Sequence, residues 1–173
     1  MKFFHANLKD LRELYNATLQ KTLDMEQQIA GALPAMVDYA TDTHLKQAFQ
    51  AHFYETQIHV NRIAQIVTCV YGRSRSVRCK VTSALIASAE DLVRDASDTS
   101  VRDAALIAVA QQIAHHQIAL YRTLRTWADS LGSTSNADTF DHILNQEKHA
   151  DFLFTGIATR IGQEAETRSS QAA

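Results

Sequence analysis

Acidic side chains and one histidine interrupt the apolar faces of several predicted helices, an arrangement that can bind a metal ion. Glu26 lies in the apolar stripe of the first predicted helix. Glu55 and His59 are four positions apart on the second, and Glu147 and Asp151 are four apart on the last, so each pair shares a helix face. Burying a carboxylate is costly unless it is paired, hydrogen-bonded or bound to a metal. These five residues therefore form the candidate metal site.

A purely structural explanation competes with the metal site. A glutamate at the edge of an apolar stripe can extend its carboxylate to solvent, or pair with a cation such as Arg62 or Lys148. For one acid this explanation is the better one, whereas acids on three helices together favour a shared site. Two alternatives stay open: an iron or manganese ion at these residues, or no metal.

The segment "QQIAHHQIALY" (111–121) breaks the pattern, because its helix carries no carboxylate there. Its face of small residues is predicted to line the bundle axis, and it offers only Gln117 and the hydroxyl of Tyr121. His115 and His116 diverge by about 100° and cannot both bind one metal. We expect His115 to meet solvent or a partner chain, and His116 to be a hydrogen-bonded core histidine.

Helices must position all of these residues, because apolar side chains recur at three- and four-residue steps through most of the chain. Four long helices and a short one are predicted. The first long helix runs from an Asn7 cap to Tyr39, with a kink or an end of its regular part at Pro34, and the second runs from residue 45 to Gly72. The short helix covers 81–93, and the last two long helices run from a Ser100/Asp103 capping box to Leu131 and from a Ser135/Asp138 capping box to Ile161.

The short helix falls in the connection between the second and third long helices, which is the arrangement of a bundle with one long crossover. The predicted fold class is therefore all-α, a ferritin-like four-helix bundle whose crossover carries a short fifth helix. We expect residues 1–163 to form the bundle. Residues 164–173 lack a run of apolar residues, and we expect a disordered tail there.

Composition excludes several functions. The 173 residues include only 5 glycines and 1 proline, which favours helices, and the net charge of −2 gives no footprint for nucleic acid. The sequence shows no signal-type hydrophobic run and no segment for crossing or binding a membrane. We expect a cytoplasmic protein with reduced thiols. Cys79 lies between Arg78 and Lys80, which can lower its pKa, but that alone assigns it no function.

Four stretches resemble the YciE/YciF-type ferritin-like proteins of bacteria, in the order of that family: "MEQQIAGALPAM" (25–36), "LKQAFQAHFYETQIHVNRI" (45–63), "VRDAALIAVAQQIAHHQIALYRTLR" (101–125) and "ILNQEKHAD" (143–151). The resemblance implies a ferritin-like bundle, usually dimeric and linked to stress responses. It also implies that Glu26, Glu55 and Glu147 match recurrent glutamates, and that His59 and Asp151 match residues frequent at those places.

The chain departs from that pattern in its third long helix and in one spacing. Members of the family commonly carry glutamate where this chain has Ala114 and Gln117. Diiron bundles use Glu-x-x-His, whereas Glu55 and His59 are four apart and Thr56 occupies the place three before the histidine. The sequence therefore favours a non-catalytic, stress-associated protein with a degenerate or altered central metal site. The alternative is a functional mononuclear or di-iron protein with weak oxidase or metal-buffering activity.

A second apolar stripe on the second predicted helix bears on assembly. It consists of Phe49, Phe53, Val60 and Val67. The third long helix likewise has apolar residues on two faces, whereas a helix in a single bundle needs only one apolar stripe, so something else must cover the rest. The short crossover helix can cover one side, and a second subunit is expected to cover another. We therefore expect a homodimer.

Overall fold

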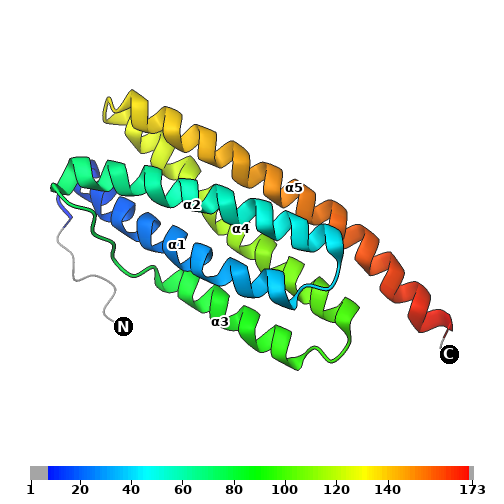
Figure 1. The fold of residues 1–173 in the computed structure, drawn as a ribbon. Coiled ribbons are helices and arrows are strands. Elements are labelled where there is room, and N and C mark those ends of the chain that lie inside the picture. The colour runs from blue at the N-terminus through cyan, green and yellow to red at the C-terminus, as the bar shows by residue number, and fades with distance from the viewer. Residues whose placement is uncertain (1–7, 172–173) are drawn as a thin grey trace.

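The structure, a computed structural model, describes residues 8–171, and for residues 164–171 it describes the backbone alone. All regular structure in this range is helical, as predicted (Figure 1). The helices are α1 (Leu11–Tyr39), α2 (Thr43–Tyr71), α3 (Lys80–Asp95), α4 (Thr99–Ser130) and α5 (Thr134–Gln171).

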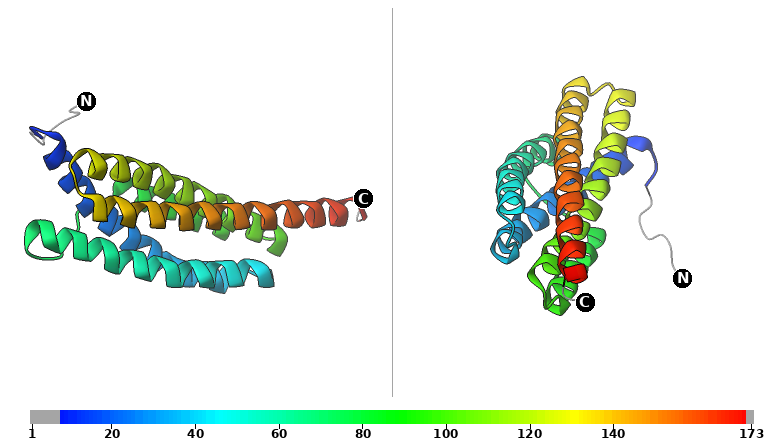
Figure 2. Two further views of the ribbon diagram at one scale, coloured as in Figure 1. Left: turned by 90° about the horizontal axis from the view of Figure 1, so that it is seen from above. Right: turned by 90° about the vertical axis from the view of Figure 1, so that its right-hand side faces the viewer.

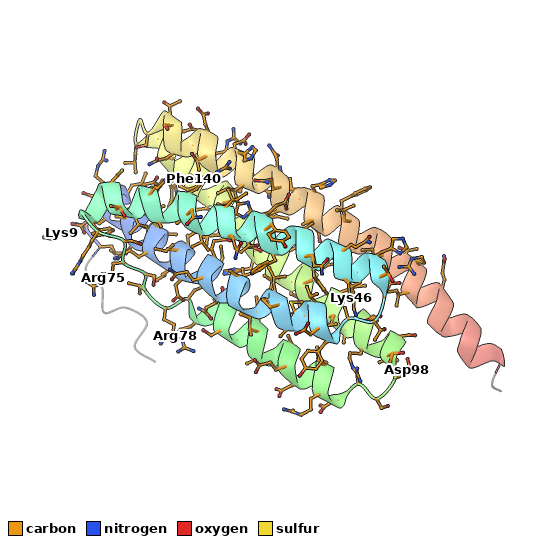
Figure 3. All side chains as sticks on the ribbon, in the orientation of Figure 1. Lys9, Lys46, Arg75, Arg78, Asp98 and Phe140 are labelled. Atoms are coloured by element: carbon orange, nitrogen blue, oxygen red, sulfur yellow. The ribbon has the colours of Figure 1, made fainter. Side chains whose placement is uncertain are left out.

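Two antiparallel hairpins, α1 with α2 and α4 with α5, pack together as a four-helix bundle (Figure 1). Residues 72–98 run back along the bundle between α2 and α4, so these two helices begin at the same end. Figure 3 shows this through Lys46 and Asp98, which both lie at that end. Helix α3 lies in the crossover and packs outside the bundle against α1 and α4. The long crossover with a fifth helix is the predicted topology.

Local signals fix most helix ends. Asp42 caps α2 through its carboxylate, which accepts from the N–H of Leu45 at 2.9 Å. Gly72 ends the same helix with a φ of 73°, a left-handed conformation that glycine adopts without a steric penalty. Gly132, with the same φ, stands in the tight turn between α4 and α5.

The start of α1 and the cap of α4 differ from the expected ones, and α1 does not end at Pro34. Helix α1 begins at Leu11, capped by Asp10, and it continues through Pro34 to Tyr39, while the expected Asn7 cap lies outside the described residues. Asp98, and not a Ser100/Asp103 capping box, caps α4.

The Asp103 carboxylate is used elsewhere in the fold. It accepts hydrogen bonds from the N–H groups of Thr41 and Asp42, both at 2.8 Å, and from the Thr41 hydroxyl at 2.6 Å. These bonds tie the start of α4 to the turn between α1 and α2. The buried Asp103 carboxylate therefore serves the amide groups of this turn, and not the cap that the sequence pattern assigns to it.

Helix α5 extends to Gln171 and projects beyond the other helices (Figure 2). The backbone of residues 164–171 is thus helical where the sequence predicts a disordered tail. Glu, Ala, Arg and Gln are strong helix formers, so the helix continues after its apolar stripe has ended. Residues 172–173 lie outside the described residues. No helix in the described range is long and apolar enough to span a membrane.

The second apolar stripe of α2 is covered within the chain. Phe49 and Val67 have no exposed surface, while Phe53 and Val60 are half-buried against the core. This stripe therefore leaves no large apolar face for a second subunit. The argument that the stripe needs a second subunit to cover it is wrong. The stripe packs inward because α1 and α5 contact α2 on two sides.

Aromatic rings close the bundle above and below its middle. The Phe49 and Phe154 rings lie 5.3 Å apart at one level, and the Tyr121 and Phe140 rings lie 6.2 Å apart at the other. Figure 3 shows Phe140 among the helices. Phe140 and Phe154 are each seven residues, about two helical turns, from Glu147 on α5. Whatever lies at the level of Glu147 is therefore enclosed between two apolar layers.

Candidate metal centre

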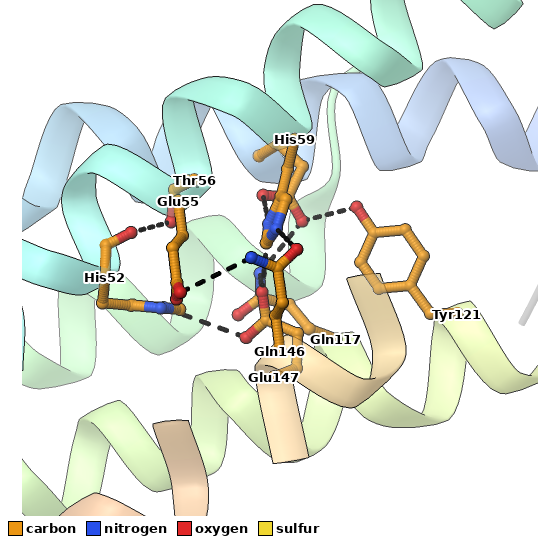
Figure 4. A network of polar contacts seen from close by, with 9 residues as sticks. His52, Glu55, Thr56, His59, Gln117, Tyr121, Gln146 and Glu147 are labelled. Carbon is orange, nitrogen blue, oxygen red and sulfur yellow. Dashed lines mark hydrogen bonds and ion pairs between the residues drawn. The ribbon is translucent and has the colours of Figure 1, made fainter. Parts of the chain in front are cut away.

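A polar cluster occupies this enclosed middle layer (Figure 4). Glu26 on α1, His59 on α2 and Glu147 on α5 have no exposed surface. Each offers one metal-binding atom, and these atoms lie within 4.8 Å of one another. The structure thus brings together three of the five predicted site residues, from three different helices.

Helix α4 contributes hydrogen-bond donors to this cluster. The Gln117 amide nitrogen donates to Glu26 Oε1 at 2.9 Å and to Glu147 Oε1 at 3.0 Å. The Tyr121 hydroxyl donates to Glu26 Oε1 at 2.7 Å (Figure 4). Both residues lie on the face of small residues that was predicted to line the bundle axis. They use their donors to satisfy two buried carboxylates.

His59 lies between the two carboxylates. Its Nδ1 is 3.2 Å from Glu147 Oε1 and 3.7 Å from Glu26 Oε2, close contacts without the direction of a good hydrogen bond. Its Nε2 is 3.2 Å from Gln146 Oε1. Burial lowers the pKa of His59, but the facing carboxylates of Glu147 and Glu26 outweigh it and raise the pKa to about 10. An imidazolium at this place supplies positive charge between the two acids.

Two further polar side chains border the cluster. Burial and the neighbouring Glu26 carboxylate raise the pKa of Tyr121 well above its usual range, so this phenol keeps its proton and acts as a donor. His52, one turn before Thr56 on α2, has its Nε2 3.9 Å from Glu147 Oε2. His52 and Gln146 were not among the predicted site residues.

The arrangement can be compared with the ligand set of dinuclear carboxylate bundles, which use one Glu from each of two helices and Glu-x-x-His from each of the other two. Here α1 supplies Glu26, and the facing position on α4 is Gln117. On α2 the Glu-x-x-His positions hold Thr56 and His59, and on α5 they hold Glu147 and Ala150. Together with Glu26 and Gln117 these make six positions, and all six side chains are buried.

Three of these six positions do not hold the ligand of that set. Gln117 donates through its amide, and Ala150 has no polar atom. The Thr56 hydroxyl is bonded to the carbonyl of His52 on its own helix at 2.7 Å. The glutamine and threonine substitutions are visible in the sequence, and counting three residues on from Glu147 would also have found Ala150.

One metal ion fits the remaining atoms, and two do not. Glu26 Oε2, His59 Nδ1 and Glu147 Oε2 are buried and lack hydrogen-bond partners. Two carboxylates and one imidazole are hard-to-intermediate ligands suited to iron, manganese or zinc. A second ion would need the ligands that Gln117, Thr56 and Ala150 do not supply.

Glu55 and Asp151 lie outside the cluster. Glu55 is half-buried and accepts a hydrogen bond from Gln146 at 3.4 Å. Asp151 lies between α4 and α5, where its carboxylate is 3.5 Å from His115 Nε2. The reason is the rotation of the helices: the residue three positions from His59 or Glu147 faces the bundle axis, and the residue four positions away does not.

The two neighbouring histidines of α4 have separate surroundings. His115 is exposed, as predicted, and contacts Asp151. His116 is half-buried, with its Nε2 3.7 Å from the sulfur of Cys79. Neither reaches the central cluster, which agrees with the expectation that they cannot both bind one metal.

Comparisons with known proteins agree with this geometry. The family described as "Domain of unknown function (DUF892)" matches residues 10–167. Protein YciF of Escherichia coli (strain K12) is 32% identical over 165 residues, which are 94% of this chain and 99% of that protein. The resemblance to YciF-type proteins inferred from sequence is therefore confirmed.

Solved structures agree in fold. That of YciF, described as an E. coli stress protein, superposes with a TM-score of 0.84 over 90% of this chain and 98% of its own. YcfI from Rhodopseudomonas palustris gives 0.84 with 33% identity, over 88% and 98% of the two chains. A structure titled as ferritin-like, diiron-carboxylate proteins, from Bacillus anthracis str. Ames, gives 0.66 with 16% identity over 87% and 98%. That last likeness shows the ferritin-like fold alone.

Proposed function

The chain belongs to the DUF892 family, and we propose that it is a stress-associated ferritin-like protein without catalytic activity, in which the central metal site has been altered. The association with stress rests on its relative YciF, which is described as a stress protein.

One observation carries the proposal: the amide of Gln117 donates to both central carboxylates. Hydrogen bonds to charged acceptors are among the stronger ones in proteins, at about 1.5–3 kcal/mol each. Gln117 thus occupies lone pairs on Oε1 of Glu26 and of Glu147, which reduces the number of carboxylate oxygens free for a metal ion. Tyr121 adds a third donor, so the acids of this layer have partners within the chain itself.

The loss of ligands also bears on catalysis. Oxygen chemistry at two metals needs a ligand set for both ions, and three of the six positions here hold glutamine, threonine and alanine. The chain keeps the fold and the buried acids of such a centre without its second half. This favours a structural role for the bundle.

A second candidate function has its own support. His59 Nδ1 lies 3.7 Å from Glu26 Oε2 and 3.2 Å from Glu147 Oε1, and one ligand atom from each of these three residues lies within 4.8 Å of the other two. This cluster fits a single iron or manganese ion. Such a protein would bind or buffer one metal per chain. The same three residues would hold the ion in place.

Metal titration separates the two functions. The full chain, stripped with a chelator, is titrated with Mn²⁺, or with Fe²⁺ without air, and bound metal and melting temperature are measured. We expect less than one ion per chain, an unchanged melting temperature, and oxygen uptake with Fe²⁺ equal to that of a protein-free control. One tightly bound ion per chain that raises the melting temperature, and that Glu26→Gln abolishes, would establish the second function. Two ions per chain would contradict both.

The proposal includes a homodimer and a cytoplasmic location. Support for the dimer now comes from large exposed apolar side chains on the adjoining helices α2 and α5: Tyr54 and Ile58, and Phe152 and Leu153. Sedimentation of the protein and of an Ile58→Asp variant tests it. A dimer is expected for the first and weaker association for the second, and a monomeric wild-type protein at micromolar concentration would contradict it.

A further inference from the structure

Cys79 and His116, which the central cluster does not use, meet on the outer side of α4. Cys79 immediately precedes α3, and its Sγ lies 3.7 Å from His116 Nε2. The hydroxyl of Thr82, in the first turn of α3, donates to the same sulfur at 3.2 Å. Adjacent residues on a helix diverge by about 100°, so His116 faces α3 while Gln117 faces the bundle axis.

The backbone of Cys79 is held from several directions. Its N–H donates to Asp24 Oδ2 at 2.7 Å, and its carbonyl accepts from the Gln28 amide at 3.2 Å and from the N–H of Ser83 at 3.1 Å. Asp24 and Gln28 belong to α1. The sulfur is therefore fixed between a histidine and a hydroxyl by contacts that do not depend on the thiol itself.

The charges around this sulfur favour its thiolate. Arg78 and Lys80 flank Cys79 in the sequence, His116 faces its sulfur from α4, and the nearby carboxylate of Asp24 accepts a hydrogen bond from the Cys79 backbone N–H. Burial raises the pKa of Cys79, but the hydrogen bonds from His116 and Thr82 outweigh it and lower the pKa to about 7. An imidazole beside a cysteine is the arrangement that activates thiols in proteins generally.

We propose that Cys79 and His116 form a peroxide-reactive thiol site, separate from the central cluster. The Cys79 thiolate attacks one oxygen of a hydroperoxide, forming an S–O bond while the O–O bond breaks. His116 accepts the thiol proton when Cys79 ionises and passes it to the departing hydroxide or alkoxide, which leaves as water or alcohol. The sulfur is oxidised to sulfenic acid and the peroxide is reduced. A small thiol then condenses with the sulfenic acid to a mixed disulfide, releasing water, and a second thiol frees the cysteine and leaves as the small-molecule disulfide.

The size of the site restricts the oxidant. Cys79 is 7% exposed, which favours a compact reagent such as hydrogen peroxide over a bulky one. Cys69, the other cysteine, is a free thiol exposed on α2, and among the described residues no imidazole is bonded to it. Exposure alone would make Cys69 the more reactive thiol, so the two cysteines provide an internal comparison.

The test measures how fast each cysteine is lost to hydrogen peroxide between pH 5.5 and 9. The full chain is treated, the peroxide is removed with catalase, the protein is unfolded, and the remaining thiols are alkylated and quantified by peptide mass spectrometry. We expect the Cys79 rate to rise with a midpoint near pH 7, and the lost thiol to return with dithiothreitol.

Two variants test the role of His116. His116→Gln keeps a hydrogen-bonding side chain without the positive charge, and it should move the midpoint for Cys79 upward by about one pH unit or more, toward the ordinary value of about 8.5. At pH 7 the Cys79 rate should fall about twofold to fourfold, since the lower thiolate fraction is partly offset by greater nucleophilicity. His115→Gln, one position away and not facing Cys79, should leave both quantities unchanged.

Specific outcomes would overturn the proposal. A wild-type midpoint for Cys79 at or above the ordinary cysteine value shows that no activated thiolate exists, and this measurement stands even if His116→Gln fails to fold. An unchanged midpoint in folded His116→Gln shows that the histidine plays no part. Metal content and the state of the central cluster do not enter this assay, so its result is independent of the proposed function.

Discussion

Replacing Gln117 by glutamate tests how the central layer is stabilised. The substitution removes the amide that donates to Glu26 Oε1 and Glu147 Oε1, at 2.9 and 3.0 Å, and places a third carboxyl group against them. Two hydrogen bonds to charged acceptors are worth about 3–6 kcal/mol together. At roughly 2–4 °C per kcal/mol for a chain of this size, the melting temperature should fall by about 6–24 °C from their loss alone.

The matched control is Gln117→Met, which removes the same donors without adding a charge. At pH 7.5 with a chelator, Gln117→Glu should melt below Gln117→Met, because three buried carboxyl groups repel one another. Burial and like charge raise the pKa of a carboxyl at this position in the folded state. The folded variant then binds a proton more readily than the unfolded chain, so its stability relative to Gln117→Met should increase as the pH falls.

Metal should partly reverse the effect in Gln117→Glu alone. A glutamate here fills one of the three empty ligand positions and gives four ligands from four helices, so Mn²⁺ or Fe²⁺ should raise its melting temperature by mass action. The assay is thermal unfolding followed by circular dichroism, with and without metal. A metal-free Gln117→Glu protein that melts together with wild type at pH 7.5 would refute the reasoning that the amide stabilises the two acids. Equally low melting with and without metal would show that no usable site remains.

Three further predictions each concern one residue. His59 has a folded-state pKa of about 10, above its unfolded value of about 6.5, so its stabilising contribution is complete below pH 6.5 and is lost as the pH rises toward 10. His59→Asn should remove this part of the pH dependence of the free energy of unfolding, measured in urea. Tyr121→Phe removes the donor 2.7 Å from Glu26 and should cost about 1.5–3 kcal/mol in the same assay, whereas a loss near zero would show that water replaces the phenol. Asp103→Asn weakens the bonds to Thr41 and Asp42 and should lower stability by about 1–3 kcal/mol, with faster amide hydrogen exchange at residues 41–42 as its specific signature.

Periodicity and chain breakers in the sequence were sufficient to predict the helices and their order. The stop at Gly72, the turn at Gly132 and the short helix in the crossover follow from local preferences, because a glycine ends a helix and an apolar stripe marks a buried face wherever it occurs. The polar residues at the axis, Gln117 and Tyr121, were also visible, since they share a face with small residues. These features depend on a few neighbouring residues, so one sequence reveals them.

Which side chains meet was decided by packing between helices. Glu55 and Thr56, like Asp151 and Ala150, lie about 100° apart around their helix, so the rotation of the helix about its own axis determines which one faces the bundle axis. That rotation follows from how α2 and α5 pack against their neighbours, and the periodicity of a single helix does not specify it. The sequence therefore predicted Glu55 and Asp151 as site residues, and the bundle turned Thr56 and Ala150 inward in their place.

Contacts between distant segments were also beyond the sequence. Cys79 and His116 were each noticed alone, as a thiol between two cations and a histidine on an apolar face, and only the position of α3 against α4 brings them within 3.7 Å. Asp103 was expected to cap its own helix, yet its carboxylate accepts hydrogen bonds from the backbone N–H groups of residues 41–42. The sequence determined which residues lie on which helix, because that is local. The tertiary structure determined their partners, because buried polar atoms take the donors and acceptors that packing places beside them.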